Sequence, residues 1–156
     1  MRYRIRNAEY REIPVLARLF QETLVQVNSR DYTGPQIEAW GRRADEERWK
    51  ELFNSSLQFM VAENEEYEIV GFTSVNSRGY IHSMFVDYRF QRKGIACLLL
   101  AKAGEYAREN GASVLSADVS ITARPFFEKQ GFCIKQKNRV NLGGITMINY
   151  TMEKQL

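Results

Sequence analysis

The chain has 156 residues, 44% of them hydrophobic, which is enough to build one domain with a real core. Its 22 basic and 19 acidic residues give a net charge of +3, too balanced to favour nucleic acid as the main partner. One histidine and two cysteines cannot form an ordinary zinc site, and no apolar run approaches the roughly 20 residues that span a bilayer. We therefore expect a single cytoplasmic domain over residues 1–156, with no metal and no membrane partner.

The first part of the chain predicts one strand followed by helices. Residues 2–7 alternate arginines with other side chains and indicate an edge strand with one basic face. Apolar residues recur at helical spacing over residues 13–27. Residues 33–36 contain a capping box that starts a second helix, and residues 49–53 form a third, short amphipathic segment.

Three strand patterns follow, over residues 57–62, 69–75 and 80–86. Short turns join them, so they predict an antiparallel meander. Gly71 lies inside the second pattern, where a glycine indicates a close approach of another part of the chain.

The turn after this meander reads Gln-Arg-Lys-Gly-Ile-Ala over residues 91–96 and opens a helical pattern. The first amides of a helix have no partner within it and are free to bind an anion. Gly94 lets the backbone come close to a ligand, and Arg89, Arg92 and Lys93 add positive charge. The turn therefore predicts a pyrophosphate-binding site.

The helix after this turn is predicted over residues 94–110. Its expected buried side carries six residues: Ile95, Leu98, Leu99, Ala103, Tyr106 and Ala107. The remaining patterns predict a parallel strand, a short helix and a hairpin, over residues 114–119, 122–130, 132–137 and 146–152. Cys97 and Cys133 fall within these patterns, so we expect both as buried thiols of a reducing compartment.

Three segments resemble the GNAT superfamily of acyl-CoA-dependent N-acyltransferases. The Gln-x-x-Gly-x-Ala pattern of residues 91–96 is similar to its Gln/Arg-x-x-Gly-x-Gly/Ala signature. Residues 84–87, Met-Phe-Val-Asp, resemble the end of its fourth strand, and residues 123–132 resemble its A-x-x-F-Y-E-K-x-G-F segment. The resemblance implies an α/β (α+β) GNAT fold, a single mixed sheet of six to seven strands flanked by about four helices.

The resemblance also implies where acetyl-CoA binds, between the fourth and fifth strands, with a backbone amide polarising the thioester carbonyl. The implied cofactor-binding residues come from a strand end, the turn and a later helix: Met84, Phe85, Val86, Gln91, Arg92, Lys93, Gly94, Ile95, Ala96, Ser120 and Phe127. Ser120 and Phe127 depart from the family, which often has Asn and Tyr there. Phe127 has no hydroxyl, so the general acid is unassigned, although a thiol with a pKa of about 8.5 is a fair leaving group.

The acceptor pocket is implied less directly. The family covers its acceptor with a variable region, the lid, which corresponds here to residues 31–53, so Tyr32, Trp40 and Trp49 are candidates to line that pocket. The alternative is that they are ordinary core aromatics.

His82 is the candidate general base, because its ordinary pKa of about 6.5 suits proton transfer near neutral pH. Strand alternation would place Tyr80, His82, Met84 and Val86 on one face, opposite Ile81, Ser83 and Phe85. Histidines stand at positions similar to Tyr80 and His82 in superfamily members that acetylate arylalkylamines, so we name both as catalytic candidates. The alternative is an inert, hydrogen-bonded core histidine.

Two functions follow from this reading. The first is an N-acetyltransferase that moves the acetyl group of acetyl-CoA to a primary amine of a small molecule or peptide, by direct attack in a ternary complex. The alternative is a non-catalytic acyl-CoA-binding sensor or scaffold, which the missing hydroxyl at Phe127 favours. His82 and the aromatic lid favour the enzyme. No motif identifies the amine or decides between a monomer and a homodimer.

Overall fold

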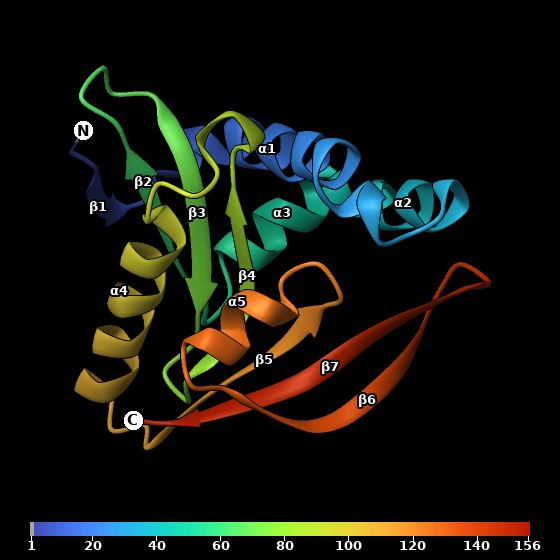
Figure 1. Ribbon diagram of the computed structural model, residues 1–156. Coiled ribbons are helices and arrows are strands. Elements are labelled where there is room, and N and C mark those ends of the chain that lie inside the picture. The colour runs from blue at the N-terminus through green and yellow to red at the C-terminus, as the bar shows by residue number, and fades with distance from the viewer. Residues whose placement is uncertain (1) are drawn as a thin grey trace.

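The computed structural model describes residues 2–156 and is built on one mixed seven-stranded sheet (Figure 1). The strand order is β1-β2-β3-β4-β5-β7-β6, and every neighbouring pair is antiparallel except β4 with β5, which is parallel. The strands are β1 (Arg4–Asn7), β2 (Gln58–Glu63), β3 (Ile69–Val75), β4 (Tyr80–Val86), β5 (Val114–Ser120), β6 (Cys133–Leu142) and β7 (Ile145–Gln155). The predicted mixed sheet and its parallel fifth strand are confirmed.

Five α-helices occur among the described residues, one more than expected. They are α1 (Ile13–Gln26), α2 (Gly34–Gly41), α3 (Glu46–Phe53), α4 (Ile95–Glu109) and α5 (Arg124–Lys129). Short 3-10 turns join several of them: η1 (Tyr10–Glu12), η2 (Asn28–Arg30), η3 (Arg42–Ala44) and η4 (Tyr88–Phe90). None of the helices in residues 2–156 is long and apolar enough to cross a membrane.

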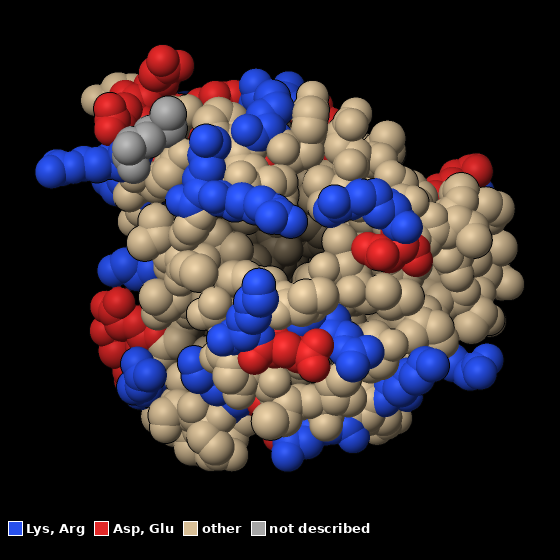
Figure 2. Space-filling view, viewed as in Figure 1, with Lys and Arg blue, Asp and Glu red and all other residues tan. Residues whose placement is uncertain are grey.

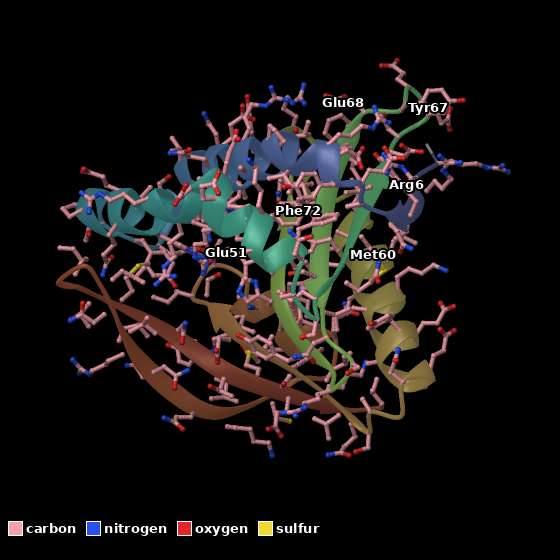
Figure 3. The ribbon with its side chains drawn as sticks, turned by 180° about the vertical axis from the view of Figure 1, so that it is seen from behind. Arg6, Glu51, Met60, Tyr67, Glu68 and Phe72 are labelled. Atoms are coloured by element: carbon pink, nitrogen blue, oxygen red, sulfur yellow. The ribbon has the colours of Figure 1, made fainter. Side chains whose placement is uncertain are left out.

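The helices cover both faces of the sheet. On one face α1 and α3 pack over Phe72 of β3, which is fully buried, and Figure 3 shows this side. On the other face α4 lies directly against β3. A Cβ on Gly71 would meet Phe85 O at 3.1 Å, Ile95 Cγ2 at 3.2 Å and Leu99 Cδ1 at 3.3 Å. The close approach expected at Gly71 is therefore confirmed, and it fixes how near the start of α4 sits to the sheet.

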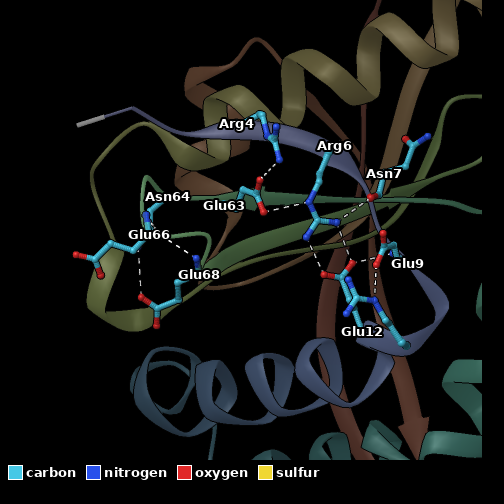
Figure 4. Close-up of polar contacts among 10 residues, drawn as sticks. Arg4, Arg6, Asn7, Glu9, Glu12, Glu63, Asn64, Glu66 and Glu68 are labelled. Carbon is cyan, nitrogen blue, oxygen red and sulfur yellow. Dashed lines mark hydrogen bonds and ion pairs between the residues drawn. The ribbon is translucent and has the colours of Figure 1, made fainter.

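The basic face of β1 is matched by buried acid at the sheet edge (Figure 4). Glu63 is almost completely buried and accepts hydrogen bonds from Arg4 and from Arg6 Nε, the latter at 3.1 Å. Arg6 also donates through Nη2 to Glu12 Oε2 at 2.7 Å. Burial alone would raise the pKa of Glu63, but the hydrogen bonds from Arg6 and Arg4 outweigh it and lower the pKa. The network ties β1, β2 and η1 together.

Three expectations about burial were wrong. Cys97 and Cys133 are both exposed, and Leu98 is 41% exposed. On α4 the buried side is centred on Leu99, Ala103 and Ala107, and Leu98 points away from that centre. Cys133 begins the edge strand β6, whose outer positions face solvent.

We expect Gly71→Ala to destabilise the fold by roughly 1–3 kcal/mol, because the added methyl group must push α4 or β4 away from β3. Urea unfolding measures the change. Gly34→Ala is the matched control, since no atom lies within 4 Å of its added Cβ. Equal stability of the two variants would show that α4 has room to spare.

Candidate active site

The site begins where β4 and β5 separate. The two strands pair only at Tyr80 with Ser116 and at Ile81 with Ala117, and beyond these pairs they diverge. A cavity of about 710 Å³ opens between them, and Figure 2 shows a hollow near the centre of this face with basic side chains around it. Backbone groups of β4 that face the opening have no strand partner there, so they are free to bind a ligand.

A β-bulge lies at the point of divergence. Against β3, Ser83 pairs with Ser74 and Ile81 pairs with Val75, so His82 is an extra residue in β4. A bulge bends its strand and increases the local twist, which is consistent with β4 turning away from β5 here.

The strict alternation expected along β4 is wrong because of this bulge. Ile81 and Met84 both pack in the core on the α4 side, whereas Phe85 packs against the α1 side. After His82, the side chains of β4 therefore lie on the opposite face from the one that strict alternation predicts.

The turn between β4 and α4 has the conformation of an anion-binding loop. Arg92 and Gly94 both have positive φ, at 60° and 83°, and Gly94 caps α4. The side chain of Gln91 donates to Val86 O at 2.7 Å and holds the turn against the strand end. No protein atom lies within 4 Å of a Cβ built on Gly94, so the space in front of the turn is open.

Positive charge at the cavity comes from three separate elements. Arg30 of η2, Arg92 of the turn and Lys129 of α5 all line it. Arg89 does not contribute as expected, because its Nη2 is bound to Asp87 Oδ2 at 2.8 Å and to Glu68 Oε2 at 2.6 Å. That expectation is wrong.

The cavity gathers most of the predicted cofactor-binding residues. Ten of them line it: Met84, Phe85, Val86, Gln91, Arg92, Gly94, Ile95, Ala96, Ser120 and Phe127. Lys93 is exposed and lies outside the lining. Phe127 is buried with its ring edge-to-face against Phe132, at 5.0 Å between centroids.

Two hydroxyl groups lie at the α5 side of the cavity. Ser120 Oγ accepts a hydrogen bond from Ala123 N at 3.0 Å, just before α5. Thr122 also lines the cavity, and its buried Oγ1 has no hydrogen-bond partner among the described residues. Sequence reasoning missed Thr122, which offers a polar contact one turn from Phe127.

The lid aromatics take different places. Trp40 lines the cavity, whereas Tyr32 and Trp49 do not. Tyr32 is buried, and its hydroxyl donates to Ile148 O at 2.8 Å and accepts from Ile121 N at 2.9 Å. Burial raises the pKa of Tyr32, so the hydroxyl stays protonated. Tyr32 thus fastens the lid to β7 and to the end of β5.

The catalytic candidates on β4 are not part of the cavity lining. His82 and Tyr80 contact each other, with ring centroids 6.4 Å apart, but neither lines the cavity. Burial, then the charges of Arg48 and Arg43, lower the pKa of His82, and its Nδ1 is buried with no hydrogen-bond partner in residues 2–156. Its imidazole is therefore neutral at pH 7 and able to accept a proton.

An acidic side chain that sequence reasoning missed does line the cavity. Asp118 of β5 accepts hydrogen bonds from Tyr80 Oη at 3.2 Å and from Thr151 Oγ1 at 2.9 Å. Burial, then the charge of Asp118, raise the pKa of Tyr80 to about 12, so Tyr80 remains a donor. The only sequence signal was a carboxylate between the apolar residues Ala117 and Val119 of a predicted strand.

No set of three or more potential His, Cys, Asp or Glu metal ligands gathers anywhere in residues 2–156. The cavity is thus built from backbone groups, apolar side chains, hydroxyls and a few charges.

Known proteins are similar to this chain both in sequence and in fold. Residues 28–154 match the family model described as Acetyltransferase (GNAT) domain. The curated protein "Uncharacterized N-acetyltransferase YafP" of Escherichia coli (strain K12) is 34% identical over 148 residues, which cover 95% of this chain and 93% of that protein.

Solved structures of N-acetyltransferases have a similar fold. A GCN5-related N-acetyltransferase from Rhodopseudomonas palustris, also described as a class-II aminotransferase, superposes with a TM-score of 0.93 at 27% identity, covering 100% of this chain and 97% of its own. The PaiA N-acetyltransferase of Thermoplasma acidophilum, in complex with coenzyme A, superposes with a TM-score of 0.82 at 18% identity over 100% of both chains.

We expect Tyr32→Phe to destabilise the protein by about 1–3 kcal/mol, because both Ile121 N and Ile148 O lose their partner. Urea unfolding measures the loss, and hydrogen exchange at the Ile121 amide should become faster. Tyr67→Phe is the control, since Tyr67 is largely exposed. Unchanged exchange at Ile121 would contradict the proposed fastening of the lid.

Proposed function

The chain belongs to the GNAT acetyltransferase family and is an acyltransferase, and from that premise we propose that it transfers the acetyl group of acetyl-CoA to a primary amine of a small molecule or peptide. The observation that carries this proposal is the cavity between the diverging β4 and β5, which opens beside an anion-binding turn. The coenzyme A held by the Thermoplasma relative supports the choice of cofactor.

The lining fits two parts of acetyl-CoA, the pyrophosphate and the pantetheine arm. The turn from Gln91 to Ala96 offers free helix amides and the guanidinium of Arg92 to the pyrophosphate. Met84, Phe85 and Phe127 supply an apolar wall for the pantetheine arm. The amides of that arm would take the place of the missing β5 partner by hydrogen-bonding to the unpaired backbone groups of β4.

Acetyl-CoA supplies an activated acetyl thioester, and the chain supplies position and proton transfer. A backbone N–H of β4 that faces the opening donates to the carbonyl oxygen, where negative charge develops. The C–N bond forms as the C–S bond breaks, and the sulfur leaves as a thiolate without help from Phe127, which keeps water away. The amine gives up its proton to neutral His82. Because His82 does not line the cavity, a water connects the two.

We expect Gly94→Asp to weaken acetyl-CoA binding by at least about 100-fold, since a carboxylate would stand beside the pyrophosphate at a position with φ of 83°. Calorimetric titration measures the affinity, and thiol release with a panel of amines measures turnover. Gly144→Asp is the matched control, because Gly144 also has positive φ and open space but lies in the β6–β7 turn. Equal acetyl-CoA affinity of the two folded variants would refute the assignment of the turn.

The pH profile tests His82. Because its pKa is lowered, the proton-accepting form is lost only as the pH falls below the ordinary value of about 6.5. After correction for ionisation of the amine, kcat/KM should fall through this acidic region. We expect His82→Gln to remove that limb and to slow turnover by about 10²–10⁴-fold, with acetyl-CoA affinity unchanged. Near-native turnover with the same acidic limb would show that His82 is not the base.

A further inference from the structure

Asp118 presents a fixed negative charge to the cavity. Its two carboxylate oxygens accept hydrogen bonds from different strands, Oδ2 from Tyr80 of β4 and Oδ1 from Thr151 of β7. Hydroxyl donors on both oxygens hold the carboxylate in one orientation. No ion pair joins Asp118 to any Lys or Arg within residues 2–156. The charge is therefore oriented but not neutralised.

This charge does not suit the cofactor. The phosphates of acetyl-CoA fit the basic residues Arg30, Arg92 and Lys129, and a carboxylate would repel them. Ala117 and Val119 face the core shared with α4 and α5, so the intervening Asp118 faces the opposite side of β5. Asp118 is also the only carboxylate among the described residues that line the cavity. It is placed to meet a second, cationic molecule.

A second polar side chain in the cavity has no hydrogen-bond partner among the described residues. Asn28 of η2 lines the cavity and is only 5% exposed, and no described residue hydrogen-bonds its side-chain amide. Because this amide lines the cavity, it can pair with a hydrogen-bonding group of a ligand. Asn28 of η2 and Asp118 of β5 thus add polar groups to the same cavity from two separate elements.

The chemistry of transfer decides which cation Asp118 receives. The attacking amine must be neutral, and a carboxylate in contact with it would stabilise its ammonium form. We infer that the acceptor is a small aliphatic diamine, whose remote ammonium pairs with Asp118 while its other amine is acetylated. This inference rests on the proposed function. Tyr80 and Thr151 are positioning residues for the carboxylate.

Calorimetric titration of 1,4-diaminobutane and of n-butylamine into the CoA-bound protein tests the inference without requiring turnover. The wild type should bind the diamine at least about tenfold more tightly than the monoamine. Asp118→Asn should abolish that preference while leaving CoA affinity unchanged, which also shows that the variant is folded. Thr151→Val, which removes one hydroxyl donor, should lower the preference partially. Glu109→Gln, an exposed acid on α4, is the control.

An equal diamine affinity in Asp118→Asn and wild type would overturn the inference, as would a wild type that binds neither amine or prefers neither. Thiol release from acetyl-CoA, measured in parallel with both amines, reports on the proposed function separately. Diamine binding that depends on Asp118 but gives no thiol would support the diamine site and reject acetyl transfer.

Discussion

The loss of hydrogen bonding between β4 and β5 is the constraint on which the rest of the structure depends. A continuous sheet would leave no cavity, whereas two paired positions followed by divergence leave one lined by free backbone groups. The opening is kept stable by what surrounds it. Gly71 lets α4 lie close against β3, which brings the first turn of α4 to the edge of the opening, and Tyr32 holds the lid to the other side of it.

The cavity lining carries charges of both signs, from separate elements. Arg89 of η4 forms ion pairs with Glu68 and Asp87, so it does not add positive charge to the cavity. Arg30, Arg92 and Lys129 remain for an anionic ligand, and the exposed carboxylate of Asp118 on β5 remains for a cationic one. A cationic molecule and an anionic one can thus occupy the same cavity without exchanging places, because attraction and repulsion act together.

Local sequence patterns predicted most of the fold. The strands at 69–75 and 80–86 and the glycine turn after them have the predicted bounds, because alternation and turn chemistry are short-range signals. The hairpin was predicted too short, because β6 is a polar edge strand without an alternating apolar face. The site was only partly predictable. The hydroxyl of Tyr32 meets groups 89 and 116 residues away, and Asp118 is held by strands distant in sequence, which no local pattern records.

The bulge at His82 changes how the two catalytic candidates on β4 are placed. One extra residue turns the strand, so alternation no longer places Tyr80 with the residues that line the cavity. Tyr80, with a pKa of about 12, stays protonated and donates its hydroxyl hydrogen to Asp118. His82 has a lowered pKa and a buried Nδ1 that has no partner in the described chain, so the neutral imidazole is able to take up a proton. In the proposed mechanism, residues of one strand thus separate the orientation of a charge, at Tyr80, from the removal of a proton, at His82.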